Sequence, residues 1–250
     1  MNMRYLQEIR FRWDRLDADS YVRSIPSFQN LGSLVFDRYV TLFSGENGAG
    51  KSTLLEAVAV AFGFNPEGGT RNYNFSTYES HSSLHQALLL VKGPRRPKSS
   101  YFLRAESFYN VATKTEEYRE FVPPEIYYRR FGGKSFHDQS HGESFMALMQ
   151  GTFSEEGFYI LDEPEAALSP QRQLTLLILI HQLAQKGAQF IIASHSPILL
   201  GIPDARILSF RDSGIRPCSY EETESYEITE MFINQREYFL KRLLSDSQDI

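Results

Sequence analysis

The sequence has a single cysteine, Cys218, and no long apolar run. One cysteine excludes an intramolecular disulfide and a metal site built from several thiolates, so a reducing compartment fits this chain best. The longest apolar runs, Ala57–Phe62 and Leu176–Ile180, are far too short to cross a bilayer, which takes about 20 residues. The N-terminal residues lack the apolar core of a secretion signal. We therefore expect a cytoplasmic chain with no transmembrane segment.

The sequence also lacks an excess of basic residues. Its 26 Lys and Arg against 31 Asp and Glu give a formal net charge of −5, which excludes a generally basic nucleic-acid-binding protein but not a local basic patch. Aromatic residues are abundant, with 19 Phe and 14 Tyr, and they suit a core and sheet faces, since base stacking would need a basic groove around them. The 250 residues are enough for one large domain, and we treat residues 1–250 as a single one.

One stretch, Gly45–Thr53, fits the phosphate-loop pattern G-x-x-x-x-G-K-[ST]. The β-prone run Tyr39–Ser44 precedes it and the helix-prone run Leu54–Phe62 follows it, so strand, glycine loop and helix come in the required order. The glycines let backbone N–H groups turn inward around phosphate oxygens, and the helix points its positive end at them. A glycine-rich turn with a chance lysine is the alternative, but it leaves the agreement of spacing and context unexplained.

Each part of this loop has an expected role in binding a nucleotide. Lys51 would reach the β- and γ-phosphates of ATP, and the Ser52 hydroxyl would ligate Mg²⁺. The predicted nucleotide-binding residues are Gly45, Glu46, Asn47, Gly48, Ala49, Gly50, Lys51, Ser52 and Thr53. ATP and Mg²⁺ are therefore the expected cofactors.

Two carboxylates follow a predicted buried strand further along the chain. The apolar run Phe158–Leu161 is followed directly by Asp162 and Glu163. A strand that ends in Asp at the carboxyl edge of a sheet places that Asp beside Ser52, where it would hold Mg²⁺. Glu163 could then act as the general base for a water in line with the γ-phosphate. Acidic residues often merely end a strand, but with the phosphate loop upstream this pair supplies the missing parts of one site.

Strands and helices alternate through the second half of the chain. The run Gln171–Lys186 predicts a helix, with Pro170 at its first position and Gly187 just past its end. The apolar run Phe190–Ala193 predicts a buried strand, and Arg206–Phe210 a further one. This alternation requires right-handed crossovers, so the predicted fold class is α/β with a mostly parallel central sheet and flanking helices.

Weaker patterns predict the remaining elements. Strands are expected at Leu6–Trp13 and Leu34–Phe36, helices at Ser144–Gln150 (stopped by Gly151) and Phe232–Leu244, and a long surface excursion at Asn65–Ser83. Two runs, Leu84–Val91 and Ser100–Arg104, are expected to form a β-hairpin with a basic tip that holds Arg95, Arg96 and Lys98. That tip is either a solvated loop or a contact for nucleic-acid phosphate or an acidic partner.

Four motifs follow one another along the chain: Gly45–Thr53, Gln139–Glu143 (Q-S-H-G-E), Leu161–Pro164 (L-D-E-P) and Ser194–Pro197 (S-H-S-P). This order resembles an ABC-class ATPase domain, and it is most similar to the stand-alone SMC/RecF-like ATPases of the AAA-like ABC group. The resemblance covers most of the chain. It implies a P-loop ATPase head with an antiparallel β subdomain and a helical signature lobe at residues 107–150, inserted between two strands of the central sheet.

The resemblance also assigns roles to single residues. In that family two heads pack head to tail, so Ser140 and Gly142 of one chain would contact the γ-phosphate bound by a second copy. His195 would sense the γ-phosphate, and Glu106 would stand where the family has a Mg²⁺-ligating glutamine. Plainer roles stay open: a helix cap for Ser140, a strand-end histidine for His195 and a surface glutamate for Glu106.

Some positions depart from the family pattern. His141 replaces the first glycine of the signature motif and adds a side chain where a backbone approaches closely. Glu143 ends that motif in place of glutamine, as in SMC-like heads. Arg12 and Tyr39 are the candidates for an adenine contact.

The motifs and the resemblance together imply an ATP hydrolase; by the resemblance, it would dimerise around Mg·ATP and switch a partner. By resemblance, the partner would be DNA or an effector protein in genome maintenance or phage defence. The alternative is the nucleotide-binding subunit of an ABC membrane transporter, against which Glu106 and the altered signature count. A third interpretation is a module that binds ATP without turnover, and the intact Glu163 counts against it.

Overall fold

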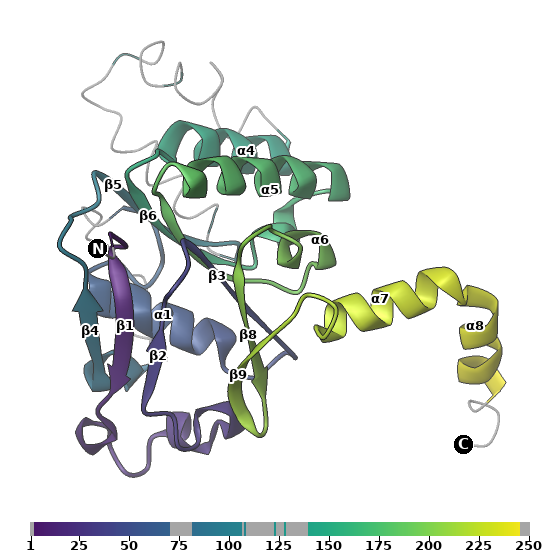
Figure 1. Cartoon of the computed structure of the whole chain (residues 1–250), viewed down its shortest axis with the longest axis horizontal. Coiled ribbons are helices and arrows are strands. Elements are labelled where there is room, and N and C mark those ends of the chain that lie inside the picture. The colour runs from purple at the N-terminus through teal and green to yellow at the C-terminus, as the bar shows by residue number, and fades with distance from the viewer. Residues whose placement is uncertain are drawn as a thin grey trace.

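The computed structural model describes residues 3–70, 82–106 and 140–245, together with Phe108, Pro123 and Tyr128. It shows a body of two sheets with their helices, from which a C-terminal helical arm projects (Figure 1). Most of the expected signature lobe at residues 107–150 lies outside the described residues, as does most of the expected excursion at Asn65–Ser83. Among the described helices, none is long and apolar enough to cross a membrane.

The central sheet has six strands in the order β5-β6-β7-β3-β8-β9. They are β3 (Val40–Gly45), β5 (Ser99–Arg104), β6 (Gly157–Asp162), β7 (Gln189–Ala193), β8 (Arg206–Arg211) and β9 (Gly214–Cys218). All neighbours are parallel except the last pair, in which β9 runs back along β8. The predicted α/β class with a mostly parallel central sheet is therefore confirmed.

Parallel pairing aligns the carboxyl ends of four strands in one row. Phe43 pairs with Ala193, Ala193 with Asp162, and Asp162 with Arg104. Every residue of β6 and β7 is buried, as continuous apolar runs predict for strands covered on both faces. The loops that leave these strands therefore meet at one edge of the sheet, where open parallel sheets bind their ligands.

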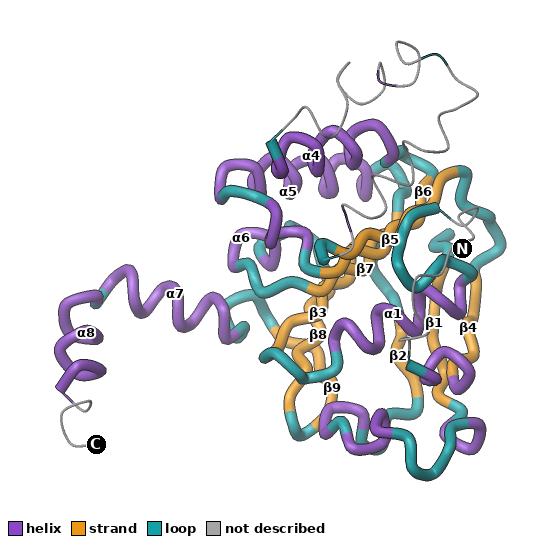
Figure 2. Tube along the Cα trace, turned by 180° about the vertical axis from the view of Figure 1, so that it is seen from behind, coloured by secondary structure: helices purple, strands orange, loops and turns teal. Residues whose placement is uncertain are grey.

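A smaller antiparallel sheet covers one face of the body. It has the order β2-β1-β4 and consists of β1 (Leu6–Phe11), β2 (Ser33–Val35) and β4 (Leu88–Lys92). Helix α1 (Lys51–Phe62) lies between this sheet and the central sheet (Figure 1, Figure 2). Buried side chains of all three layers, such as Ile9, Val58 and Ile191, form one core. The predicted antiparallel β subdomain is confirmed.

Three helices cover the opposite face of the central sheet: α4 (His141–Thr152), α5 (Pro170–Gln185) and α6 (Pro197–Leu200). Their buried side chains form a second core with the sheet. Helix α5 begins at Pro170 as predicted, and Gly187 follows its end with a φ of 105°. Helix α4 starts earlier than predicted, because Ser140 and Glu143 form a capping box at its N-terminus, and it continues through Gly151.

The predicted hairpin between Leu84–Val91 and Ser100–Arg104 is wrong. Strand β4 pairs with β1 in the smaller sheet, whereas β5 pairs with β6 in the central sheet. The connection between them is held on both sides: the Gly93 N–H donates to the Tyr5 carbonyl and the Lys98 N–H to the Glu156 carbonyl, each at 2.9 Å. Pairing with strands distant in the sequence therefore overrode the local turn signal.

The predicted helix at Phe232–Leu244 is confirmed as helical, but it is broken at Gln235 and does not close onto the body. Two helices replace it, α7 (Glu224–Asn234) and α8 (Arg236–Ser245), which bend at Gln235 and project from the body (Figure 1, Figure 2). Short 3-10 helices complete the described chain: η1 (Trp13–Arg15), η2 (Tyr21–Ser24), η3 (Pro26–Phe28), η4 (Ser83–Ala87) and η7 (Pro164–Ala167).

A buried glutamine joins the two sheets. Gln189 at the start of β7 has no exposed surface. Its Oε1 accepts hydrogen bonds from the Tyr5 and Leu6 N–H groups, each at 2.9 Å, and its Nε2 donates to the Leu6 carbonyl at 2.7 Å. The amide thus satisfies three backbone groups where β1 begins.

We expect the change Gln189→Leu to lower the free energy of unfolding by about 3 kcal/mol or more, because two buried N–H donors and one carbonyl lose their partner. Chemical denaturation of the full chain measures this. Gln185→Leu, on the exposed end of α5, is the matched control and should change stability by no more than about 0.5 kcal/mol. Equal effects of the two substitutions would contradict the role of Gln189.

Candidate active site

The predicted phosphate loop connects β3 to α1, and its glycines are required by its shape. Gly45, Gly48 and Gly50 have φ values of 146°, 81° and 94°, which side-chain-bearing residues rarely adopt. A Cβ on Gly45 would lie 2.5 Å from the Phe210 carbonyl oxygen, and one on Gly50 would lie 2.9 Å from Phe28. The loop therefore packs tightly on β8 and η3, and α1 begins directly after it at Lys51. This places unpaired N–H groups of a helix N-terminus at the loop.

Lys51 is buried beneath this loop. Its Nζ donates to the carbonyl oxygens of Gly45 and Glu46, each at 2.8 Å. Burial lowers the pKa of the Lys51 ammonium, while the nearby Glu163 and Asp162 carboxylates act in the opposite direction. The ammonium is therefore held at the loop by neutral carbonyls, which phosphate oxygens could replace.

Asp162 ends β6 beside the first turn of α1. The Ser52 hydroxyl donates to Asp162 Oδ1 at 2.9 Å, although the two residues lie far apart in the sequence. Burial raises the pKa of the Asp162 carboxyl to about 6, against the lowering effect of the Ser52 hydrogen bond and of the Arg104 guanidinium. The Arg104 Nε lies 3.9 Å from Asp162 Oδ2. A buried carboxylate of this kind favours a further cation close by.

The three predicted metal ligands gather around one small cavity. Ser52, Glu106 and Asp162 line it together with Arg104 and Glu163. Glu106 is largely exposed and forms an ion pair with Arg104, whose Nη1 also donates to Glu56 Oε2 of α1 at 2.7 Å. Hydroxyl and carboxylate oxygens suit Mg²⁺, so the residues present fit this ion. Within the described part of the chain, no group of three or more His, Cys, Asp or Glu residues is arranged to hold a metal ion.

Glu163 has an unusual backbone. Its φ and ψ are 49° and 51°, the left-handed region, and its N–H donates to the Ala193 carbonyl at 3.0 Å. Non-glycine residues in this region cost about 1–3 kcal/mol and cluster at functional sites. The turn after β6 therefore sends the half-exposed Glu163 side chain into the cavity beside Ser52 and Asp162.

His195 follows β7 and faces Glu163. Its Nε2 lies 3.7 Å from Glu163 Oε1, and this buried atom has no hydrogen-bond partner among the described residues. Burial lowers the pKa of the imidazole, Lys51 adds to this, and Glu163 acts against it. His195 Nε2 is thus a polar atom beside the phosphate loop whose hydrogen-bonding capacity a bound group could use.

Glu165 is a site residue that the sequence analysis missed. Its Oε1 accepts from the Ser194 hydroxyl at 2.9 Å, from the His195 N–H at 2.5 Å and from the Ser196 N–H at 3.2 Å. One carboxylate oxygen thus fixes the whole turn that carries His195. The only sequence signal is a second glutamate two residues after Glu163, and it does not reveal that its partners lie beyond the next helix.

Ser140 and Gly142 lie apart from the phosphate loop of the same chain. Ser140 caps α4, with its N–H and hydroxyl donating to Glu143 Oε2 at 3.0 and 2.6 Å. Gly142 packs so closely on α5 that a Cβ there would lie 2.5 Å from Arg172 Nη1. Neither residue lines a cavity described at the phosphate loop. The structure thus bears out the cap role of Ser140, and it does not bring these two residues to the other site residues within one chain.

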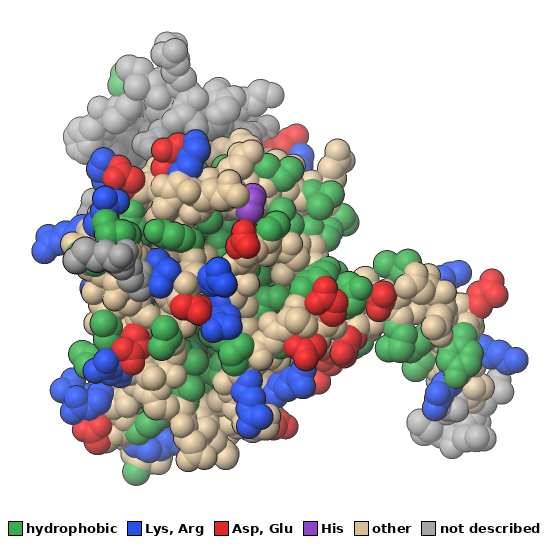
Figure 3. All heavy atoms as spheres, viewed as in Figure 1, with side chains coloured by type: hydrophobic (Ala, Val, Ile, Leu, Met, Phe, Trp, Pro, Cys, Tyr) green, Lys and Arg blue, Asp and Glu red, His purple; other side chains and the backbone are tan. Residues whose placement is uncertain are grey.

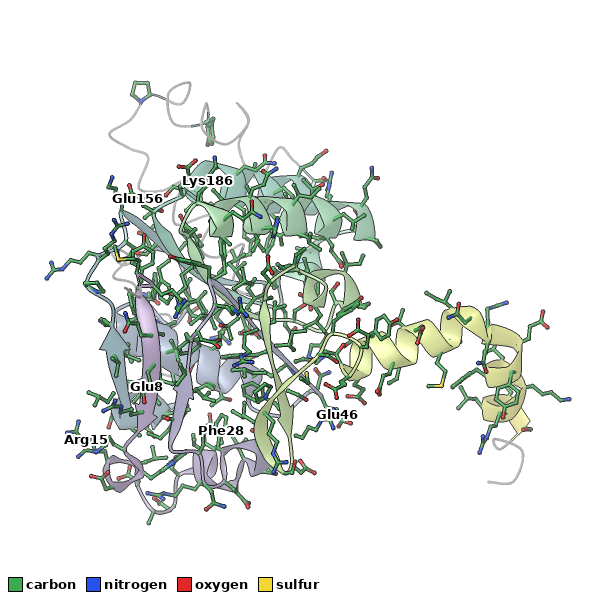
Figure 4. All side chains as sticks on the ribbon, viewed as in Figure 1. Glu8, Arg15, Phe28, Glu46, Glu156 and Lys186 are labelled. Carbon is green, nitrogen blue, oxygen red and sulfur yellow. The ribbon has the colours of Figure 1, made fainter. Side chains whose placement is uncertain are left out.

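A cavity of about 610 Å³ opens beside the phosphate loop. Its walls are the loop, η3, the turn after β8 and the start of α7, with Ser27, Arg211 and Glu227 among the polar side chains. Figure 4 shows Phe28 of η3 below the loop and Glu46 near the start of α7. Neither adenine candidate lines this cavity: Tyr39 lies just before β3, at the opposite end of that strand from the loop, and Arg12 precedes η1.

Comparisons with known proteins agree on the kind of domain. A family model described as "AAA domain" matches residues 21–182. The cytochrome c biogenesis ATP-binding export protein CcmA of Legionella pneumophila is 28% identical over 167 residues, which are 64% of this chain and 80% of that protein.

Solved structures include similar domains as well. The SMC head domain from Thermotoga maritima is 18% identical, with a TM-score of 0.48 over 87% of this chain and 100% of that one. The cbiO1 protein from Clostridium perfringens, part of the ABC transporter complex cbiONQ, is 16% identical, with a TM-score of 0.49 over 94% of this chain and 97% of that one.

Proposed function

We propose that this chain, which belongs to the AAA domain family, is an ABC-type ATPase head that hydrolyses ATP with Mg²⁺. The observation that carries this proposal is the hydrogen bond between Ser52 at the start of α1 and Asp162 at the end of β6. It joins a phosphate loop to a buried carboxylate, the two parts that hold a metal in P-loop enzymes.

In the proposed reaction each residue acts at a stated atom. Lys51 Nζ would leave the carbonyls of Gly45 and Glu46 and bind the β- and γ-phosphate oxygens, while Ser52 and Asp162 hold Mg²⁺ and Glu106 faces the same cavity. Mg²⁺ bound there would neutralise charge on the phosphate oxygens. Glu163 would take the proton of the attacking water, and His195 Nε2 would bind a γ-phosphate oxygen.

We further propose that two copies complete each site. Ser140 and Gly142 lie away from their own phosphate loop, at the N-terminus of the 12-residue helix α4, which suits binding of anionic oxygens. A head-to-tail dimer would bring this helix start to the γ-phosphate held by the other copy. Closing and opening of that dimer would then switch a bound partner.

Two candidate functions differ in the partner that the ATPase would switch. In the first, the partner is DNA or an effector protein. The basic connection after β4 supports this function because it contains Arg95 and Arg96, although the neighbouring Lys98 forms an ion pair with Glu156. A transporter subunit is the second, supported by the similarity to the ATP-binding export protein CcmA. Both use the same ATP site.

Glu163→Gln tests the proposed hydrolysis directly. We expect phosphate release to fall about 100-fold or more, because the amide cannot take the proton from water, while ATP binding persists. Steady-state ATPase rates and nucleotide retention measure the two properties. The exposed Glu155, changed to Gln, is the control. If Glu163→Gln hydrolysed ATP at the parent rate, Glu163 would not be the general base.

Mixing two inactive variants tests the shared site. The Lys51→Ala chain has an inactive phosphate loop but an intact Ser140. The Ser140→Arg chain has a blocked N-terminus of α4 but an intact phosphate loop. Each alone should be inactive, whereas the mixture should regain activity, because one intact site forms across the two chains. A mixture that stays inactive, although the two chains associate, would show that the site lies within one chain.

Glu165 should act through His195. We expect Glu165→Ala to lower kcat roughly 10- to 100-fold without raising KM for ATP, because the turn that carries His195 loses its anchor. Combining it with His195→Ala should cost no more than His195→Ala alone. Glu165→Gln keeps an accepting oxygen and should retain most activity. Additive losses in the double variant would assign Glu165 a separate role.

A further inference from the structure

The arm formed by α7 and α8 is open to solvent. No residue of these two fully described helices is buried. Twelve large hydrophobic side chains are exposed in the described residues, and seven belong to the arm: Ile228, Met231, Phe232, Ile233, Tyr238, Leu243 and Leu244. Figure 3 shows acidic side chains gathered where α7 leaves the body, and hydrophobic and basic ones further along the arm.

Short helices of this kind need a partner. With 11 and 10 residues, α7 and α8 are below the roughly 12–15 residues at which isolated helices are marginally stable in water. Each carries apolar residues spaced by three and four positions, Ile228, Met231 and Phe232 on α7 and Leu240, Leu243 and Leu244 on α8. Such a stripe normally packs against another helix.

The charges of the two helices are complementary. Helix α7 has three glutamates and no basic residue: Glu224, Glu227 and Glu230. Helix α8 has three basic residues, Arg236, Lys241 and Arg242, against the single Glu237. Within the described part of one chain, none of these seven side chains forms an ion pair. The bend at Gln235 keeps the two helices from lying along each other.

We propose that the arm binds the arm of a second copy of this chain. In a twofold arrangement α7 of each copy would lie antiparallel to α8 of the other, so that acidic helices face basic ones and the apolar stripes meet inside a four-helix cluster. The nearly equal lengths of α7 and α8 suit this exchange. The twofold contact needs no nucleotide, so it stands apart from the proposed ATP-dependent closure of the heads.

This contact would tether two ATP sites. Glu224 and Ile228 of α7 line a cavity at the phosphate loop together with Asn47 and His195, so the arm starts at the active site. Two heads joined by their arms would stay in one assembly while open, which raises the effective concentration for closure.

Charge exchange between the arms tests the proposal. Sedimentation of the nucleotide-free parent chain should give twice the chain mass of 28.8 kDa. Variant A, Lys241→Glu with Arg242→Glu, has two acidic helices, and variant B, Glu227→Lys with Glu230→Lys, has two basic ones. Each alone should be monomeric because like charges face each other. An equimolar mixture of A and B should form a heterodimer, since both of its helix pairs are again of opposite charge.

Each outcome decides the question. A parent chain that sediments as a monomer without nucleotide overturns the proposal, as do variants A and B that remain dimeric alone or fail to associate when mixed. Recovery of the dimer in the mixture also shows that both variants fold. Loss of hydrolysis in Glu163→Gln bears on the ATP site alone, so failure of the arm contact and failure of the proposed ATPase function are distinguishable.

Discussion

Parallel pairing of β6, β7 and β3 is the constraint on which the rest of the structure depends. It places Phe43, Ala193 and Asp162 in one row, so the chain leaves all three strands at the same edge of the sheet. The phosphate loop, the turn with Glu163 and the turn with His195 are direct continuations of that row. A slip of one residue in β6 would move Asp162 to the other face of the sheet and away from Ser52. The buried strand interiors therefore determine the site geometry.

The site concentrates polar groups that the protein alone leaves poorly compensated. Lys51 and Asp162 are both buried. Burial lowers the pKa of Lys51 and raises the pKa of Asp162, and so favours the neutral form of each. Within the described residues, His195 Nε2 and Glu165 Oε2 are buried without a hydrogen-bond partner. Such atoms are costly in a folded protein and cluster where a ligand completes the network. An anionic phosphate with a divalent cation would supply a partner of opposite charge to Lys51 and to Asp162 alike.

The sequence predicted the parts of this site that depend on local geometry. Gly45–Thr53 could be predicted because a tight turn requires glycine at fixed positions. Asp162 could be predicted because a carboxylate directly after an apolar run indicates the end of a buried strand. Glu165 was not predictable, since its acceptor role depends on a turn that the next helix separates from it. Dependence on distant residues also explains why the predicted hairpin was wrong. Strands β4 and β5 are neighbours in the chain, but β4 pairs with β1 and β5 with β6, both of which are distant in the sequence.

The C-terminal arm shows a different limit. The apolar spacing around Phe232 and Leu244 did predict helix, and helix is what forms, but spacing alone does not say which surface receives the apolar side. In the described structure neither α7 nor α8 buries a residue against the body, whose central sheet is already covered on both faces. An amphipathic segment that its own domain does not bury needs a surface from another molecule, and a segment with one acidic and one basic helix is complementary to a copy of itself. The unburied side chains of the arm therefore carry information about assembly, as the unpaired atoms of His195 and Glu165 do about a ligand at the ATP site.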